Sequence, residues 1–224
     1  MNNPTPIAFL HTSASLVPVF KELCEQHLDG KQVEVFHLAD DSLILNTIRR
    51  GKLTPDTARR VVGHVRSLEE AGARRVVATC SSIGPAVETA AALVDIPVHR
   101  IDRPMAEEAV ARGTRIGVAA TLATTLEPTS ELIRRVAGEA GRGVELVTEC
   151  CEGAFEALMA GDADEHDRRV VAALHKLMDQ SGVVVLAQAS MARVAERLPP
   201  AADNSVPILT SPPLAMKFLR NRLD

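Results

Sequence analysis

The stretch RRVVATCSSIGPAVE, residues 74–88, decides the fold. It begins with a short β-branched run, passes through a turn that contains Cys80, and continues into a helical pattern. Short apolar runs without clean alternation are typical of parallel strands that are buried on both faces. Pro85 suits the first turn of the following helix, and Gly84 permits a tight turn before it. The stretch therefore predicts a strand, a turn and a helix, with Cys80 where the strand ends.

A second version of this stretch, GVVVLAQASMARVAE, occupies residues 182–196 and aligns Gln188 with Cys80. The similarity extends over most of the chain, because four segments of the first half recur in the same order in the second. The matched pairs are 6–23 with 115–133, 33–44 with 144–155, 58–82 with 167–190, and 95–110 with 205–219. Four matches in one order indicate an internal duplication.

Each half reads as four strands that alternate with helices. The helices are amphipathic: Val61, Val65 and Leu68 fall on one face of a helix expected over 57–72. Alternating strands and helices predict right-handed crossovers and a parallel sheet. We therefore expect an α/β protein with two pseudo-symmetric, doubly wound lobes, each a four-stranded parallel sheet of order 2-1-3-4 flanked by helices. Ligands of such sheets gather at the carboxyl ends of the strands, so the duplication predicts a cleft between the lobes.

Composition excludes several classes of protein. The net charge is −4, and the chain has no Trp, no Tyr and no basic block, which argues against nucleic-acid binding. No apolar run reaches the length of a membrane span, and the N-terminus lacks the pattern of a signal peptide. The four cysteines form no CxxC element, so we expect reduced thiols and a cytoplasmic protein. There is no GxGxxG, P-loop or HExxH motif, so no metal or nucleotide cofactor is predicted.

Cys80 is a candidate catalytic residue on its local sequence. The amides at the start of the following helix would stabilise an anion, whether a substrate carboxylate or the Cys80 thiolate. Thr79, Ser81 and Ser82 flank it, and a purely structural core position rarely needs three hydroxyls. The alternative is a small buried cysteine, which is the commoner role of a free thiol.

Hydroxyl side chains also follow the first strand of each half. They are Thr12, Ser13 and Ser15 in one half and Thr121, Thr124 and Thr125 in the other. Each alone reads as a turn or helix-capping residue, but the symmetric set predicts a cradle for a carboxylate. His11 ends the first strand, and two interpretations stay open: a residue that binds a carboxylate or assists proton transfer, or a hydrogen-bonded strand-end histidine.

The motif VVATCSSIGPA, together with the duplicated halves, resembles the aspartate/glutamate/hydantoin racemase superfamily, which includes arylmalonate decarboxylase-like and maleate isomerase-like enzymes. The resemblance implies two similar α/β lobes, no cofactor, a small carboxylate substrate, and a homo-oligomer of two or more subunits. It also implies a cysteine at the end of the third strand of each lobe, the two thiols facing the substrate carbon from opposite sides.

The chain departs from that pattern at AQASM, where Gln188, followed by Ala189 and Ser190, replaces the second cysteine. An amide is neither an acid nor a base near neutral pH. Arylmalonate decarboxylase-like members work with one thiol, which is the cysteine of their second lobe. This chain keeps the cysteine of the first lobe, so the same chemistry would give a product of the opposite hand. Cys150 or Cys151 could instead supply a second thiol from a different strand, although a structural pair is the expected role.

These observations predict a cofactor-independent enzyme in which Cys80 transfers a proton at the α-carbon of a small carboxylate and Gln188 orients the substrate. A single-cysteine decarboxylase of a malonate-like substrate is the first alternative. A hydrolase with Cys80 as nucleophile and a non-catalytic binding protein remain further alternatives. The expected lobes are residues 1–112 and 113–210, and the resemblance allows 211–224 to complete the first lobe.

Overall fold

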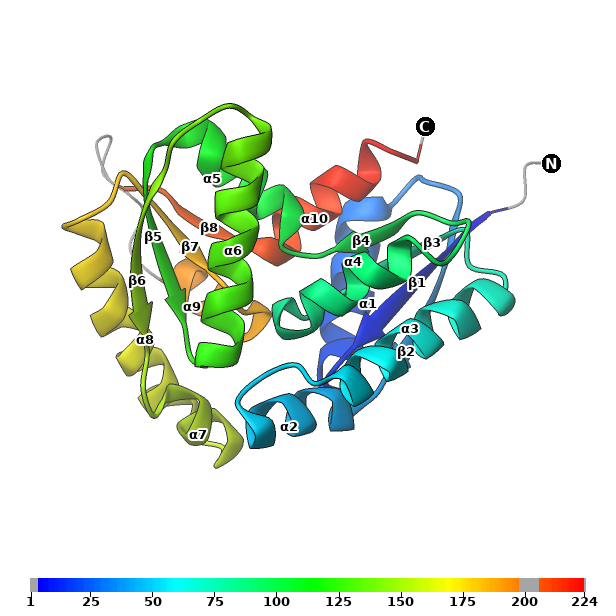
Figure 1. The fold of residues 1–224 in the computed structure, drawn as a ribbon, viewed down its shortest axis with the longest axis horizontal. Coiled ribbons are helices and arrows are strands. Elements are labelled where there is room, and N and C mark those ends of the chain that lie inside the picture. Colours follow the sequence, from blue (N-terminus) through cyan, green and yellow to red (C-terminus); the bar gives the residue numbers. More distant parts are fainter. Residues whose placement is uncertain (1–3, 198–205, 224) are drawn as a thin grey trace. The chain divides into compact units, whose positions relative to one another are not determined.

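The computed structural model describes residues 4–197 and 206–223, which form two compact units. Unit 1 comprises Met1–Ile101 and Pro212–Asp224, and unit 2 comprises Asp102–Ser211. The chain therefore leaves unit 1 after its fourth strand and returns to it after the last strand of unit 2. As a result, the helix that follows each sheet along the chain belongs to the other unit (Figure 1).

Unit 1 contains a parallel sheet of order β2-β1-β3-β4, which is the order that the sequence predicts. Its elements are β1 (Thr5–His11), α1 (Leu16–Leu28), β2 (Val33–Ala39), α2 (Asp41–Arg50), α3 (Pro55–Glu70), β3 (Arg75–Ala78), the short 3-10 helix η1 (Ser81–Ile83), α4 (Gly84–Ala91), β4 (Val98–Arg100) and α10 (Ser211–Arg220).

Unit 2 repeats this plan with a parallel sheet of order β6-β5-β7-β8. Its elements are α5 (Arg103–Arg112), β5 (Arg115–Ala120), α6 (Ala123–Glu139), β6 (Glu145–Cys150), α7 (Ala154–Met159), α8 (Ala163–Met178), β7 (Val183–Leu186), the 3-10 helix η2 (Ala189–Met191), α9 (Ala192–Arg197) and β8 (Ile208–Thr210). Two four-stranded parallel sheets with the same strand order, both flanked by helices, confirm the predicted fold class.

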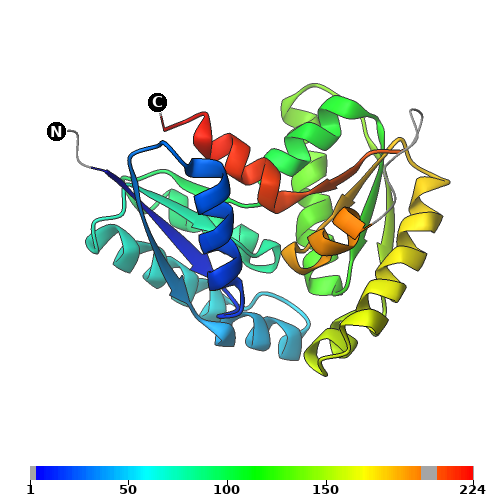
Figure 2. The same cartoon turned by 180° about the vertical axis from the view of Figure 1, so that it is seen from behind.

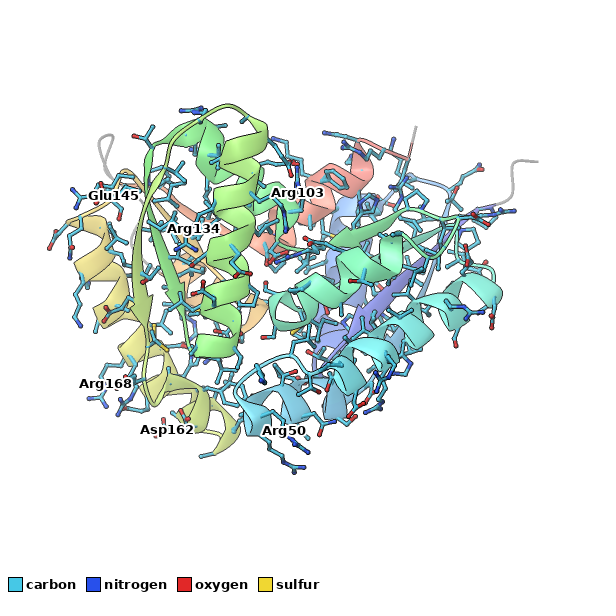
Figure 3. All side chains as sticks on the ribbon, viewed as in Figure 1. Arg50, Arg103, Arg134, Glu145, Asp162 and Arg168 are labelled. Carbon is cyan, nitrogen blue, oxygen red and sulfur yellow. The ribbon has the colours of Figure 1, made fainter. Side chains whose placement is uncertain are left out.

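The structure differs from the prediction after the second strand of each sheet, where two helices replace one. In unit 1, α2 ends at Gly51, which takes the left-handed conformation (φ 65°), and Thr54 caps α3. In unit 2, Gly161 also has a positive φ (83°), and the carboxylate of Asp162 accepts the N–H of Glu165 at 3.0 Å to start α8 (Figure 3). In both units, a glycine follows the end of the first helix, and a capping residue shortly after it begins the next.

The core of unit 1 lies on both faces of its sheet. On one face, Ala8 and Leu10 pack against residues of α2, α3 and α4. On the other, Ile7 and Phe9 pack against residues of α1 and α10, which lie side by side in Figures 1 and 2. The C-terminal helix therefore supplies part of the core of unit 1, although more than a hundred residues of unit 2 separate it from β4.

One corner of the α1 face is built from histidines. His11 is fully buried: its Nδ1 lies 2.9 Å from Thr79 Oγ1, and its Nε2 lies 2.9 Å from His37 Nδ1. Its ring also packs against Phe20, with the ring centroids 5.3 Å apart. Burial, and then the charge of His37, lower the pKa of His11 to about 4. His11 is therefore a neutral, hydrogen-bonded part of the core at neutral pH.

Replacement of Met216, a fully buried residue of α10, tests the contribution of that helix. We expect Met216→Ala to lower the free energy of unfolding by about 2–5 kcal/mol, because it leaves a cavity against the sheet. The exposed neighbour Lys217 is the matched control, and Lys217→Ala should change stability by less than about 0.5 kcal/mol. Urea denaturation followed by circular dichroism measures both values. Equal stability of the two variants would contradict this role of α10.

The buried histidine predicts a loss of stability in weak acid. Since the pKa of His11 is about 4 in the fold and about 6.5 in the unfolded chain, the unfolded state binds the proton first as pH falls. Stability should decrease as pH falls from about 6.5 to about 4, and this group should have no further effect below that range. Urea denaturation at several pH values should show a weaker decrease for His11→Gln than for the wild type. The control is His175→Gln, which replaces an exposed histidine. The same dependence of unfolding free energy on pH in all three proteins would contradict the prediction.

Candidate active site

Cys80 lies at the carboxyl end of β3, where the sequence predicts it. Its backbone is extended (φ −131°, ψ 121°) and it precedes the first turn of η1, after which α4 begins with Pro85 in its first turn. The register pairs β1 with β3 so that both strands end at the same edge of the sheet. The first residue after β1, Thr12, is therefore brought beside Cys80.

Several donors converge on the sulfur of Cys80. The hydroxyl of Thr12 donates from the end of β1, and the backbone N–H groups of Ser82 and Ile83 donate from η1, together with the side chain of Ser82. Burial is the largest influence on this thiol and raises its pKa, while these hydrogen bonds act in the opposite direction. Donors of this kind stabilise a thiolate, so they offset part of the cost that desolvation imposes on the anion of this partly exposed cysteine.

The sequence predicts that Gly84 is needed for a tight turn before α4, and this explanation is wrong. Its backbone is right-handed helical (φ −48°, ψ −48°), a conformation open to any residue, so no special turn requires glycine there. The space beside its Cα is filled instead by Arg100: a Cβ at Gly84 would lie 2.3 Å from Cζ of that guanidinium. Nothing in the local motif predicts this contact, because Arg100 ends the next strand.

Two other predicted residues of unit 1, His11 and Ser13, are not among the groups that bond to the Cys80 sulfur. Both ring nitrogens of His11 are bonded to protein groups, as described above. The hydroxyl of Ser13, which is partly exposed, lies 2.8 Å from that of Ser15. In contrast, Ser81 and Ser82 are buried in the turn beside Cys80.

Gln188 occupies the same place in unit 2 that Cys80 occupies in unit 1. It has an extended backbone (φ −126°, ψ 139°) and precedes η2. Its side-chain oxygen accepts the backbone N–H of Thr121 at 2.5 Å and the Thr121 hydroxyl at 3.0 Å. Thr121 follows β5 as Thr12 follows β1, so the same threonine position binds the second residue after the third strand in both units. Because the oxygen is held, the two amide N–H donors are directed away from Thr121.

The other predicted residues of unit 2 lie near this edge of its sheet. Ala189 and Ser190 form η2 and are partly exposed. Thr124 is in the first turn of α6, and its buried hydroxyl has no hydrogen-bond partner among the described residues. Thr125, in the same turn, is buried.

The adjacent cysteines lie at the end of the edge strand β6. Cys151 is buried in the core of unit 2, and burial is the largest effect that raises its pKa to about 12. Cys150 is partly exposed, and burial together with the charges of nearby glutamates raises its pKa. The surroundings of both cysteines disfavour a thiolate, whereas several hydrogen bonds oppose the effect of burial at Cys80.

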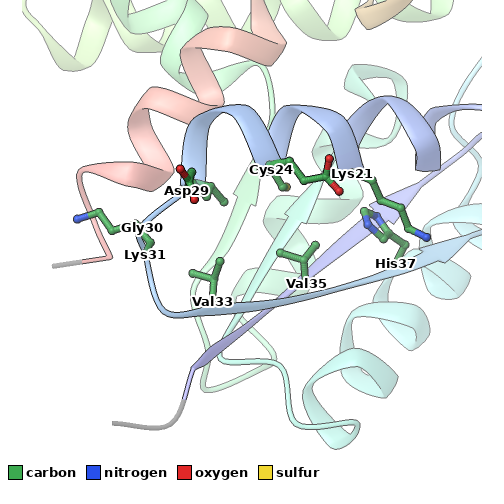
Figure 4. A pocket seen from close by; sticks show the side chains of 10 residues that line it. Lys21, Cys24, Asp29, Gly30, Lys31, Val33, Val35 and His37 are labelled. Atoms are coloured by element: carbon green, nitrogen blue, oxygen red, sulfur yellow. The ribbon is translucent and has the colours of Figure 1, made fainter. Parts of the chain in front are cut away.

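Three other kinds of feature bear on function in the described residues: pockets, groups of metal ligands and membrane-spanning helices. A pocket of about 420 Å³ lies between α1 and β2, where Lys21, Cys24 and His37 are among its lining residues (Figure 4). In residues 4–197 and 206–223, no three His, Cys, Asp or Glu side chains are grouped to hold a metal ion. Within the same residues, no helix combines the length and the apolar character that crossing a membrane requires.

Solved structures with the same fold include the following three proteins, each of low sequence identity to this chain. Aspartate racemase from Picrophilus torridus has a TM-score of 0.72 and 9% identity, with 98% of this chain and 94% of that chain covered. Allantoin racemase from Klebsiella pneumoniae has a TM-score of 0.67 and 17% identity, with 97% and 86% covered. A mutant of arylmalonate decarboxylase in its sulfate-associated form has a TM-score of 0.58 and 19% identity, with 97% and 92% covered.

No protein among the curated sequences matches the chain. The family model described as Asp/Glu/Hydantoin racemase, however, matches residues 8–219, a range that includes both Cys80 and Gln188. This match supports an enzyme of the isomerase type and confirms the resemblance that the sequence motifs indicate. The chain belongs to the Asp/Glu/Hydantoin racemase family.

Proposed function

We propose that this protein is a cofactor-independent enzyme that transfers a proton at the α-carbon of a small carboxylate, with Cys80 as the group that carries the proton. The observation that supports this most directly is the set of donors around the Cys80 sulfur, from Thr12, Ser82 and Ile83. A purely structural thiol would not need four donor groups that stabilise its anion. Membership of a racemase family supports the same reaction class.

The proposed step needs no reactant other than the substrate and solvent water. The Cys80 thiolate takes the α-proton, so an S–H bond forms as the C–H bond breaks, and the electron pair moves into an enediolate of the substrate carboxylate. Return of the proton from the Cys80 thiol restores the thiolate and the starting hand. A proton that solvent delivers to the opposite face gives the other hand, and Cys80 then loses its proton to solvent. The α-proton of a carboxylate is a very weak acid, so the enediolate must be stabilised by hydrogen-bond donors. The amides and hydroxyls of the strand-end loops, including Ser81, are our candidates for those donors.

Gln188 favours a second candidate function, decarboxylation of a malonate-like substrate. Its oxygen is bound by Thr121 and it has no titratable group, so it offers N–H donors to a carboxylate or carbonyl oxygen but cannot move a proton. In that reaction, loss of CO2 generates the enediolate, and Cys80 alone protonates it. Protonation by one thiol would give a product of one hand. The homo-oligomer expected from the family resemblance stays a prediction.

Solvent-deuterium incorporation, followed by NMR in D2O, tests the role of Cys80. A panel of aspartate, glutamate, hydantoins, malate, maleate and arylmalonates covers the proposed substrate classes. With a substrate that reacts, we expect deuterium at the α-carbon, and a decrease of at least about 100-fold in its rate in Cys80→Ala. The partly exposed Cys150 of β6 is the matched control, and Cys150→Ala should keep the wild-type rate.

The same spectra separate the candidate functions. Deuterated product of both hands supports racemisation, and deuterated product of one hand with release of CO2 supports decarboxylation. An adduct on Cys80 detected by mass spectrometry, without deuterium at carbon, would indicate the hydrolase alternative. Undiminished exchange in Cys80→Ala would exclude Cys80 as the proton-transferring group.

Replacement of Gln188 by glutamate tests its proposed role as a hydrogen-bond donor. Gln188→Glu keeps an oxygen for the Thr121 donors but removes both amide N–H groups. We expect kcat/KM to fall roughly 10- to 100-fold, since a hydrogen bond to a charged group contributes about 1.5–3 kcal/mol. The exposed Gln180 provides the control, because Gln180→Glu makes the same change outside the strand ends. Unchanged kcat/KM in Gln188→Glu would show that the enzyme does not use these donors.

A further inference from the structure

Arg100 is a nearly buried arginine at the end of β4, and its side chain is only 5% exposed. The register places it directly beside Ala78 of β3, two residues before Cys80. Its Nη1 donates to the carboxylate of Glu88 in α4 at 3.0 Å. A buried charge is costly unless it is paired, so this position is held by specific contacts.

The guanidinium group of Arg100 lies against the backbone of Gly84. A Cβ at Gly84 would lie 2.3 Å from Cζ and 2.6 Å from each of Nε and Nη1, so three atoms of the planar group occupy the place of a side chain. The glycine leaves room for this close approach, whereas its backbone conformation is an ordinary helical one that does not itself call for glycine. Arg100 therefore contacts the chain where η1 passes into α4.

This contact adjoins the donors that serve Cys80. Gly84 directly follows Ile83, whose N–H donates to the Cys80 sulfur, and the Gly84 N–H is bonded to the carbonyl of Ser81. The turn from Ser81 to Gly84 is thus attached to β3 at one end and packed against Arg100 at the other. A shift of the turn by a few tenths of an ångström would misalign the amides, because hydrogen bonds depend steeply on direction.

We infer that Arg100 is a positioning residue: its planar guanidinium, packed on Gly84 and paired with Glu88, holds the Ser81–Gly84 turn so that the amides of Ser82 and Ile83 point at the Cys80 sulfur. The inference deepens the proposed function and rests on it for the role of Cys80. Lysine could supply the charge but not the planar surface, so the two residues are not equivalent at this position.

The reactivity of the Cys80 thiol with iodoacetamide, measured against pH, tests this inference without any substrate. Mass spectrometry of the Cys80 peptide separates it from the other three cysteines. We expect Arg100→Gln and Arg100→Lys to shift the pH profile of Cys80 alkylation upward by about one unit, which is a tenfold loss of thiolate below the pKa. Gly84→Ala should shift it in the same direction, because the added methyl group displaces the guanidinium.

A double-mutant comparison makes the test sharper. If Gly84 and Arg100 act through one contact, the shift in Gly84→Ala with Arg100→Gln should be smaller than the sum of the single shifts. Glu88 is only partly buried, so Glu88→Gln offers a variant with less risk to folding and should give a smaller upward shift. Arg75 lies at the opposite end of β3, and Arg75→Gln is the matched control, with an unchanged profile expected.

Three results would overturn the inference. A wild-type profile in folded Arg100→Gln, or in Glu88→Gln if the first variant does not fold, would show that the turn does not depend on this arginine. A wild-type profile in Arg100→Lys with a shift in Arg100→Gln would assign the effect to charge alone. Additive shifts in the double variant would show that Gly84 and Arg100 act separately. Because alkylation needs no turnover, these results are independent of the deuterium experiment, which tests the proposed function.

Discussion

Hydrogen bonds to a single sulfur atom are the constraint on which the arrangement of unit 1 depends. One donor comes from Thr12 after β1, and others come from Ser82 and Ile83 in η1, so residues about seventy positions apart must meet. A parallel sheet brings them together, because β1 and β3 end at the same edge. The opposing effects of burial and hydrogen bonding on the thiol follow from this convergence.

The second unit keeps the backbone of this arrangement and changes its chemistry. Thr121 takes the position of Thr12, and Gln188 takes that of Cys80, with the same extended backbone before a 3-10 turn. The partner of the threonine changes from a thiol, which titrates, to an amide, which does not. The duplicated fold thus provides two similar strand ends, of which one carries a group able to exchange a proton.

Two buried polar groups near the Cys80 turn have different roles because they lie on different faces of the sheet. His11 alternates with Leu10 and Thr12 along β1, so its ring enters the α1 face, where Phe20 and His37 surround it. Arg100 lies on the α4 face, against Gly84. The alternation of a β-strand therefore separates a neutral core histidine from the arginine that contacts the turn.

The sequence by itself determined the class of fold, the duplication and the strand-end positions of Cys80 and Gln188, because these follow from local burial patterns and from similarity along the chain. The division into two helices after β2 and β6 is also marked locally, by Gly51 with Thr54 and by Gly161 with Asp162, although the alternating pattern predicts one helix there. Only the tertiary structure decided the surroundings of His11 and the contact between Gly84 and Arg100. Both depend on side chains that are distant in sequence, and a local pattern carries no information about which distant group will fill a given space.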